Sequence, residues 1–334
     1  MFLIVFETAT AVVRYYICLQ CTNSYATQIE DQGNFSLNFP YLFLHRVYLA
    51  IKKPFIDPLL HRCPQAQIRF NDLKDFIKRR TLRSRRTWIQ VQSGFAQGLW
   101  MYLLVPEETI FWRGDREPVV QRAISAIIRQ GDVVYDVGAH FGSLTLGIAR
   151  LVGNSGRVVA FDGDPDNVER LRGNVLRNHF GAFAQPVHTA VWSHRREPRI
   201  PFRRGKTRTS QGGVEADGQR PVLGDGEIIS VPVTTLDDFT ASGGPAPQLI
   251  KIDVEGGEYE VLRGGAILFA NKRPLIIVEV HHQDAADKIS GWLQEFHYSA
   301  KWRIPVEKFP RCLIAWAVEH SPPVLPNQPD VNAI

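Results

Sequence analysis

The sequence has few cysteines and no long hydrophobic run, and each absence excludes a class of protein. Four cysteines in 334 residues are too few for a secreted scaffold held together by disulfides, and Cys18-x-x-Cys21 has no second ligand pair nearby to complete a zinc site. Glu7 and Arg14 interrupt the apolar start, residues 1–6, before it reaches the roughly 20 residues of a membrane span. We therefore expect a cytoplasmic protein without a transmembrane segment; peripheral contact with a membrane stays open.

The sequence also lacks the closely spaced glycines of a dinucleotide-binding loop. The apolar run 133–137 leads instead into Asp-x-Gly-x-x-x-Gly, formed by Asp136, Gly138 and Gly142. A pyrophosphate needs backbone N–H groups at close approach, whereas a ligand that has a cationic amino-acid end and no phosphate needs a carboxylate. The pattern therefore favours S-adenosylmethionine, with Asp136 at its methionine ammonium, over the nicotinamide cofactor of a dehydrogenase.

Composition and charge are those of an ordinary globular protein, with 44% hydrophobic and 22% charged residues. The net charge of +5 is concentrated in a basic helix predicted over 74–86 and in a loop over 195–208. Such clusters can hold the phosphates of RNA or lipid, but solvated faces are the favoured interpretation because no aromatic residues are interleaved with them.

The order of patterns along the chain predicts one large domain after an extension. Residues 1–87 predict a helical or irregular N-terminal extension, residues 88–320 a domain, and residues 321–334 a tail. The domain begins with strand-like residues 88–112 and continues over 117–318 with alternating strands and helices, which predicts a parallel sheet with crossover helices. The predicted strands are 132–137, 157–161, 186–191, 228–233, 249–253, 274–280 and 312–318, the last at an edge; residues 199–227 are expected to form a long mobile loop.

Acidic residues follow three of these strands. Asp162 ends the second core strand, where a carboxylate can accept hydrogen bonds from both hydroxyls of a ribose. Asp253 ends the fourth and faces the same crevice as Asp136. We expect the three aspartates to converge on one positively charged nucleoside, with Asp253 at its sulfonium or at the acceptor hydroxyl.

Further titratable residues lie on the same predicted rim. His281 is the preferred general base, since its unperturbed pKa of about 6.5 suits proton abstraction, and Glu255 is the second candidate. Glu279 could orient His281. No metal site is predicted, although a divalent ion held by Asp253, Glu279 and His281 stays as an alternative.

Several segments together resemble one family, the FkbM-type S-adenosylmethionine-dependent methyltransferases. The resemblance covers about 88–318, and its most specific part is the block Lys251-Ile252-Asp253-Val254-Glu255-Gly256. The matching segments are 114–118, 131–142, 159–162, 233–238, 249–258, 261–265 and 277–280. In this sequence His140 replaces the usual Asn of the glycine loop, and Asp162-Gly163 replaces a Glu-Pro pair.

The resemblance implies a Rossmann-like class I methyltransferase fold, with a seven-stranded, mostly parallel sheet whose last strand is antiparallel. It also implies S-adenosylmethionine as methyl donor and O-methylation of a small-molecule hydroxyl on a sugar or natural product. The cofactor-binding residues are then Asp136, Gly138, Ala139, His140, Gly142, Asp162 and Asp253, and the catalytic residues Asp253, His281 and Glu255. An RNA methyltransferase and a non-catalytic adenosylmethionine-binding protein are the alternatives.

Overall fold

The computed structural model describes the methyltransferase-like part of the chain. The described residues are 85–105, 107–114, 116–194, 196–205, 212–215, 226–302 and 310–325. The chain divides into two compact units, residues 1–81 and 82–334, and all described residues belong to the second. The expected extension over 1–87, apart from its last three residues, and most of the basic helix over 74–86 lie outside the described residues, as do Cys18 and Cys21.

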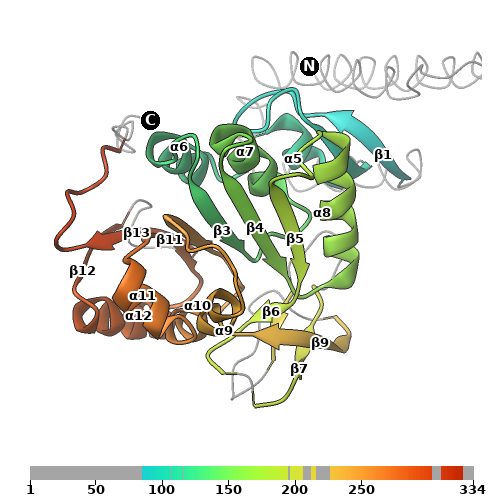
Figure 1. The fold of residues 1–334 in the computed structure, drawn as a ribbon. Helices are drawn as coiled ribbons and strands as arrows, with labels where there is room; N and C mark the ends of the chain where they lie inside the picture. Colours follow the sequence, from blue (N-terminus) through green and yellow to red (C-terminus); the bar gives the residue numbers. More distant parts are fainter. Residues whose placement is uncertain are drawn as a thin grey trace, which may run out of the picture. The chain divides into compact units, whose positions relative to one another are not determined.

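A seven-stranded sheet forms the centre of the second unit (Figure 1), in the order β12-β13-β11-β10-β3-β4-β5. Its strands are β3 (Val133–Val137), β4 (Arg157–Asp162), β5 (Ala184–His188), β10 (Leu249–Ile252), β11 (Leu275–Val280), β12 (Tyr298–Trp302) and β13 (Arg311–Ala317). The neighbours from β5 to β11 pair in parallel, and β13 is antiparallel to both of its neighbours. The expected Rossmann-like sheet with an antiparallel last strand is confirmed.

Helices cover this sheet, as crossover connections between parallel strands require. They are α5 (Thr109–Arg113), α6 (Pro118–Ile127), α7 (Ser143–Val152), α8 (Pro165–Arg177), α9 (Leu236–Ala241), α10 (Glu258–Arg263), α11 (Ala266–Lys272) and α12 (Gln283–Glu295). Apolar residues of α10, α11 and α12, among them Val261, Phe269 and Ile289, share one buried core with Ile252 and Val278 of the sheet. Among the described residues, no helix is long and apolar enough to cross a membrane.

The last strand of the chain does not lie at an edge, so that expectation was wrong. β13 is inserted between β11 and β12, and β12 forms the edge. Burial explains the difference: six of the seven residues of β13 apart from its ends are almost entirely enclosed or nearly so, as an interior strand requires, whereas Ala300 and Lys301 of β12 are exposed. A lysine on an exposed strand is a common feature of sheet edges.

A second, smaller sheet occupies part of the region expected to be a loop. It has the order β6-β9-β7-β8, formed by β6 (Ala190–Val191), β7 (Arg199–Arg203), β8 (Gly213–Val214) and β9 (Ile228–Thr234). The expectation of a loop throughout 199–227 was wrong, because Ile200 and Phe202 alternate with exposed neighbours and are buried in a separate apolar cluster. This sheet follows β5 and lies below the lower ends of β3, β4 and β5 in Figure 1.

The strand-like residues before the main sheet form a hairpin. β1 (Arg85–Gln90) pairs antiparallel with β2 (Trp100–Val105), and the chain then turns into α5, so residues 109–112 are helical and not part of a strand. The free edge of β2 is bonded by side chains of α8: the N–H groups of Trp100 and Tyr102 donate to Asn178 and Asn174 at 2.8 Å. Side chains of one helix face thus take the place of a neighbouring strand.

Candidate functional site

The loop that follows β3 passes very close to the loop that follows β10. Gly138 has φ +80°, and a Cβ atom there would lie 1.7 Å from the carbonyl oxygen of Asp253. The N–H groups of Gly138 and Ala139 both donate to the carbonyl oxygen of Phe161, at 3.0 and 2.9 Å. Only glycine fits at position 138, and the loop is thereby fixed between the carboxyl ends of β3, β4 and β10.

His140 adopts the left-handed backbone conformation, with φ +53°, in the middle of this loop. Asparagine and histidine tolerate that conformation better than most residues, which accounts for a histidine where the family usually has asparagine. Its ring is buried beside Phe141 and Phe111. Burial, together with the charges of Arg170 and Arg116, holds the pKa of His140 well below its usual range, so the ring is neutral.

Asp162 ends β4 and faces the glycine loop from the other side. One carboxylate oxygen accepts the backbone N–H of His140 at 2.8 Å, and the other accepts the N–H of Asp164 at 2.9 Å. Burial raises the pKa of Asp162 to about 6, against the lowering effect of these hydrogen bonds. The carboxylate therefore stabilises the loop and retains lone pairs that could accept the hydroxyls of a ribose.

Asp136 lies beneath the loop and not on its surface. Its side chain is 0% exposed, its Oδ2 accepts a hydrogen bond from the Thr145 hydroxyl at 2.6 Å, and its Oδ1 lies 3.5 Å from Nζ of Lys251. The same Nζ lies 3.4 Å from Oδ2 of Asp253. The predicted contact between Asp136 and a methionine ammonium stays a prediction, and it would have to compete with this lysine.

Lys251 is the residue of the site that the sequence interpretation missed. Burial would lower the pKa of its ammonium, but the charges of Asp253 and Asp136 raise it above its usual value. The signal was present: a lysine in the middle of a buried strand needs a buried carboxylate as partner, and two acidic residues end the neighbouring chain segments.

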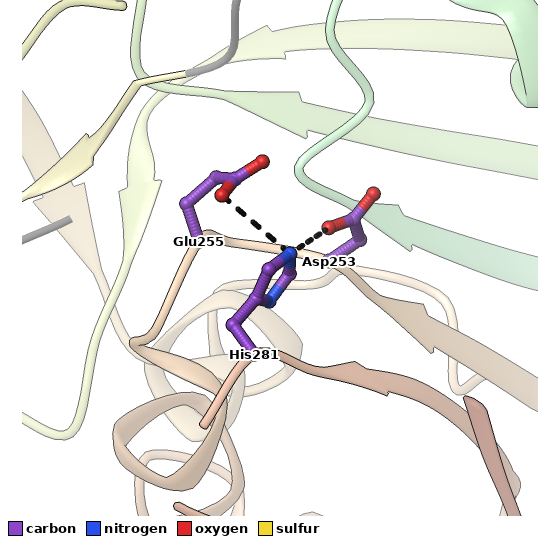
Figure 2. A group of neighbouring side chains, drawn as sticks. All are labelled: Asp253, Glu255 and His281. Carbon is purple, nitrogen blue, oxygen red and sulfur yellow. Dashed lines mark ion pairs between the residues drawn. The ribbon is translucent and has the colours of Figure 1, made fainter. Parts of the chain in front are cut away.

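Asp253, Glu255 and His281 come together at the carboxyl ends of β10 and β11 (Figure 2). Nε2 of His281 lies 3.6 Å from Oδ1 of Asp253 and 3.5 Å from Oε2 of Glu255. On the opposite side of the ring, Nδ1 donates to Oε1 of Glu258 at 2.6 Å. All four side chains are buried, so the imidazole is held in one orientation with Nε2 between two carboxylates.

The three predicted catalytic residues thus form one cluster, and Glu279 is not part of it. Glu279 lies instead with Glu117 and Asp253, where three carboxylate oxygens come within 4.8 Å of one another. His282, the second histidine of the pair, accepts the N–H of Ala285 and caps the start of α12.

The protonation of the cluster follows from burial and from crowding of like charges. Burial raises the pKa of Glu255 to about 7, and the charges of Asp253 and Glu258 add to that rise, against the lowering effect of His281. Burial alone would lower the pKa of His281, but the hydrogen bond to Glu258 and the charges of Asp253 and Glu255 raise it to about 10. An imidazole with that pKa already carries its proton at neutral pH, so Glu255 is better matched than His281 to accept a proton from a hydroxyl.

A small cavity lies between the cofactor loop and the second sheet. It encloses about 30 Å³ and is lined by Gly138, Asp162 and Gly163 on one side and by Trp192 and Phe202 on the other, among others. The ring of Phe202 packs against Gly163, where a Cβ atom would lie 2.7 Å from it. Liquid water occupies about 30 Å³ per molecule, so a nucleoside fits here only when Phe202 moves away from Gly163.

The described part of the basic segment 195–208 offers little free positive charge. Arg203 forms an ion pair with Glu215, and Arg204 pairs with both Asp164 and Asp166 at 2.7 Å. These pairs give no support to binding of RNA phosphates.

Comparison with known proteins identifies the family. The model of the methyltransferase FkbM domain matches residues 136–300. The chain is 32% identical over 180 residues to the 31-O-demethyl-FK506 methyltransferase FkbM of Streptomyces tacrolimicus, covering 48% of this chain and 69% of that protein. It is 28% identical over 222 residues to the hexuronic acid methyltransferase AglP of Haloferax volcanii, covering 63% of this chain and 80% of that protein. The chain belongs to the FkbM family of S-adenosylmethionine-dependent methyltransferases.

Among solved structures, the chain is similar to a methyltransferase FkbM from Methylobacillus flagellatus. The TM-score is 0.42 at 16% identity, over 58% of this chain and 48% of that one.

Proposed function

We propose that this methyltransferase transfers the methyl group of S-adenosylmethionine to a hydroxyl group of a small molecule, a sugar acid or a natural product. The observation that carries the proposal is the buried cluster of Asp253, Glu255 and His281, which lies beside the glycine loop at the tips of adjacent strands. The printed names of the relatives support it, since AglP acts on a hexuronic acid and FkbM on 31-O-demethyl-FK506.

The residues around the glycine loop fit the cofactor. Gly138 leaves room for close approach to the backbone, Asp162 has lone pairs for the ribose hydroxyls, and Asp136 Oδ1, which has no hydrogen-bond donor, is the acceptor beneath the methionine end. Ala139, His140 and Gly142 complete the loop. When bound, the cofactor supplies an electrophilic methyl group on a sulfonium, which is already a good leaving group.

The chemical demand on the protein is alignment and removal of one proton. Holding the acceptor oxygen in line with the methyl carbon and the sulfur can contribute roughly 7–11 kcal/mol. Glu255, with a pKa near 7, takes the hydroxyl proton, while the acceptor oxygen forms its bond to the methyl carbon. His281, held by Glu258, positions the carboxylates of Glu255 and Asp253.

The test is to incubate the full chain with methyl-labelled S-adenosylmethionine and a panel of hexuronic acids, hydroxylated natural products and RNA. Mass spectrometry is expected to show a gain of one methyl group on a hydroxyl of a small molecule. Transfer to RNA with a steep decline on addition of salt, or cofactor binding without transfer to any acceptor, would contradict the proposal.

A further inference from the structure

We propose that Asp253, Glu255 and His281 bind a divalent cation, of the kind that takes mixed oxygen and imidazole ligands, such as Mn²⁺ or Zn²⁺. The inference rests on the proposed function, because the cation would hold the oxygen of the acceptor hydroxyl. It departs from the sequence-based expectation, which assigned no metal and grouped His281 with Glu279.

The spacing of the three ligand atoms supports a shared cation. Nε2 of His281 lies 3.6 and 3.5 Å from the nearest oxygens of Asp253 and Glu255, which is longer than the hydrogen bonds of about 2.7–3.2 Å that nitrogen makes to oxygen. Two ligands about 2.1 Å from a tetrahedral Zn²⁺ lie about 3.4 Å apart. The two separations therefore match ligands that face each other across a metal ion.

The orientation of the imidazole supports the same assignment. Nδ1 of His281 donates to Oε1 of Glu258 at 2.6 Å, and Glu258 is 0% exposed. A metal-binding histidine commonly donates its other ring N–H to a carboxylate, which fixes the tautomer and directs the lone pair of the free nitrogen at the metal. Figure 2 shows Nε2 pointing between Asp253 and Glu255.

Charge balance provides a third, independent observation. Three buried carboxylates surround one imidazole, and Oε2 of Glu255 has no hydrogen-bond donor although that residue is only 2% exposed. The nearby cations are engaged elsewhere: Lys251 lies between Asp253 and Asp136, and Arg116 pairs with Glu117 at 2.6 Å. Buried charges are normally paired or coordinate a metal, so a divalent cation would supply the missing positive charge.

The cation would leave the bond changes of the proposed reaction as they are and make the first of them easier. Three protein ligands leave further positions open on the ion, as in catalytic metal sites, and an acceptor oxygen bound there loses its proton more readily. The O–H bond breaks and the proton passes to a carboxylate of the cluster. The oxygen then bonds to the methyl carbon, and the C–S bond breaks with its electron pair on sulfur.

The experiment is a Mn²⁺ titration of the full chain, freed of metal with a chelator, in the absence of cofactor and acceptor. Electron paramagnetic resonance of free Mn²⁺ is expected to show one bound ion per chain, and pulsed measurements to show coupling of that ion to an imidazole nitrogen. Glu255→Gln and His281→Gln are expected to weaken binding more than about 100-fold, since loss of a supporting second-shell residue alone costs about 10–100-fold. Glu258→Gln is expected to fall in that smaller range, and His281→Gln to abolish the nitrogen coupling.

Glu279→Gln is the matched control, because it removes a neighbouring buried carboxylate that belongs to the other group of acidic residues. It is expected to bind Mn²⁺ almost as the wild type does. The proposal is overturned if the wild type binds no Mn²⁺ at millimolar concentration, if folded Glu255→Gln binds it normally, or if Glu279→Gln loses it. Calorimetry with S-adenosylmethionine separates the two proposals: cofactor binding and methyl transfer in the presence of chelator would leave the proposed function standing and remove the cation.

Discussion

Gly138 and Gly98 have nearly the same backbone conformation, φ +80° and +79°, in very different surroundings. A side chain at Gly98 would meet nothing within 4 Å, whereas one at Gly138 would collide with the backbone of Asp253. The pair therefore separates the cost of a left-handed backbone from the cost of crowding.

Gly98→Ala is expected to lower the free energy of unfolding by about 1–2 kcal/mol, the cost of a left-handed residue with a Cβ atom. Gly138→Ala is expected to cost about 1–3 kcal/mol more, because the loop has to move away from Asp253. Urea denaturation of both variants measures the difference. Equal losses would show that the close approach at Gly138 carries no energetic weight.

Asp162 predicts a dependence of stability on pH with an unusual sign. Because burial raises its pKa from 3.8 to about 6, the folded chain binds a proton before the unfolded chain does as the pH falls. The contribution of Asp162 to stability is therefore fully present below about pH 4 and is lost as the pH rises to about 6. A shift of about two units corresponds to about 3 kcal/mol.

The control for this prediction is Asp162→Asn, which cannot titrate. Denaturation of both proteins at several pH values between 4 and 7 is expected to show the wild type losing stability relative to the variant as the pH rises. A constant offset reflects the changed hydrogen bonds, and parallel curves would contradict the assigned pKa.

At the scale of elements, the second sheet is attached to the cluster-bearing segment through Trp192. This side chain is 1% exposed, and it packs against Gly257, where a Cβ atom would lie 2.6 Å from its ring. Gly257 lies between Glu255 and Glu258, so the small sheet supports the turn that presents the cluster.

Trp192→Ala is expected to lower the free energy of unfolding by about 3–5 kcal/mol, the usual cost of removing a large buried aromatic side chain. Trp100→Ala, at a half-buried tryptophan, is the control and should cost clearly less. Thermal denaturation measures both. Similar losses for the two variants would show that Trp192 does not hold the small sheet in place.

The sequence predicted the elements whose burial produces a simple pattern. Continuous apolar runs predicted β3, β4, β10 and β11, and the acidic residues after them predicted which strand ends meet. The edge strand β12 and strand β7 were missed because Lys301, Arg199 and Pro201 interrupt their apolar character. The position of β13 depends on pairing between distant segments, and its own residues carry no information on which neighbours it has.

The grouping within the site follows the same division. That Asp253, Glu255 and His281 share one rim could be predicted, since all three follow neighbouring parallel strands. That Glu258 holds His281, and that Lys251 lies between Asp136 and Asp253, depends on side-chain directions that spacing alone does not determine.

At the scale of the whole molecule, a buried ion pair joins the segment before the sheet to α8. Arg170 makes two hydrogen bonds to the carboxylate of Glu108, at 3.0 and 2.6 Å, with side chains 3% and 0% exposed. The guanidinium also lies 4.0 Å from the centre of the Phe141 ring in the cofactor loop. The hairpin, α8 and the loop are thus held by one residue.

Glu108→Gln is expected to lower the free energy of unfolding by about 3–5 kcal/mol, because it leaves the charge of Arg170 buried without its partner. Glu319→Gln breaks a comparable pair with Arg273 whose glutamate side chain is 52% exposed, and it should leave the midpoint of urea denaturation nearly unchanged. Equal effects of the two variants would contradict the structural weight given to the buried pair.

The insertion of β13 between β11 and β12 has a consequence for how the protein is made. Synthesis begins at the amino end, so the nascent chain presents β11 and β12 before the strand that joins them has left the ribosome. During that interval β11 exposes an unpaired edge, a site where chains can associate wrongly. The final step in assembling this sheet is the threading of a late strand into an existing gap, which makes the carboxyl-terminal segment the one whose delay most exposes the newborn protein to aggregation.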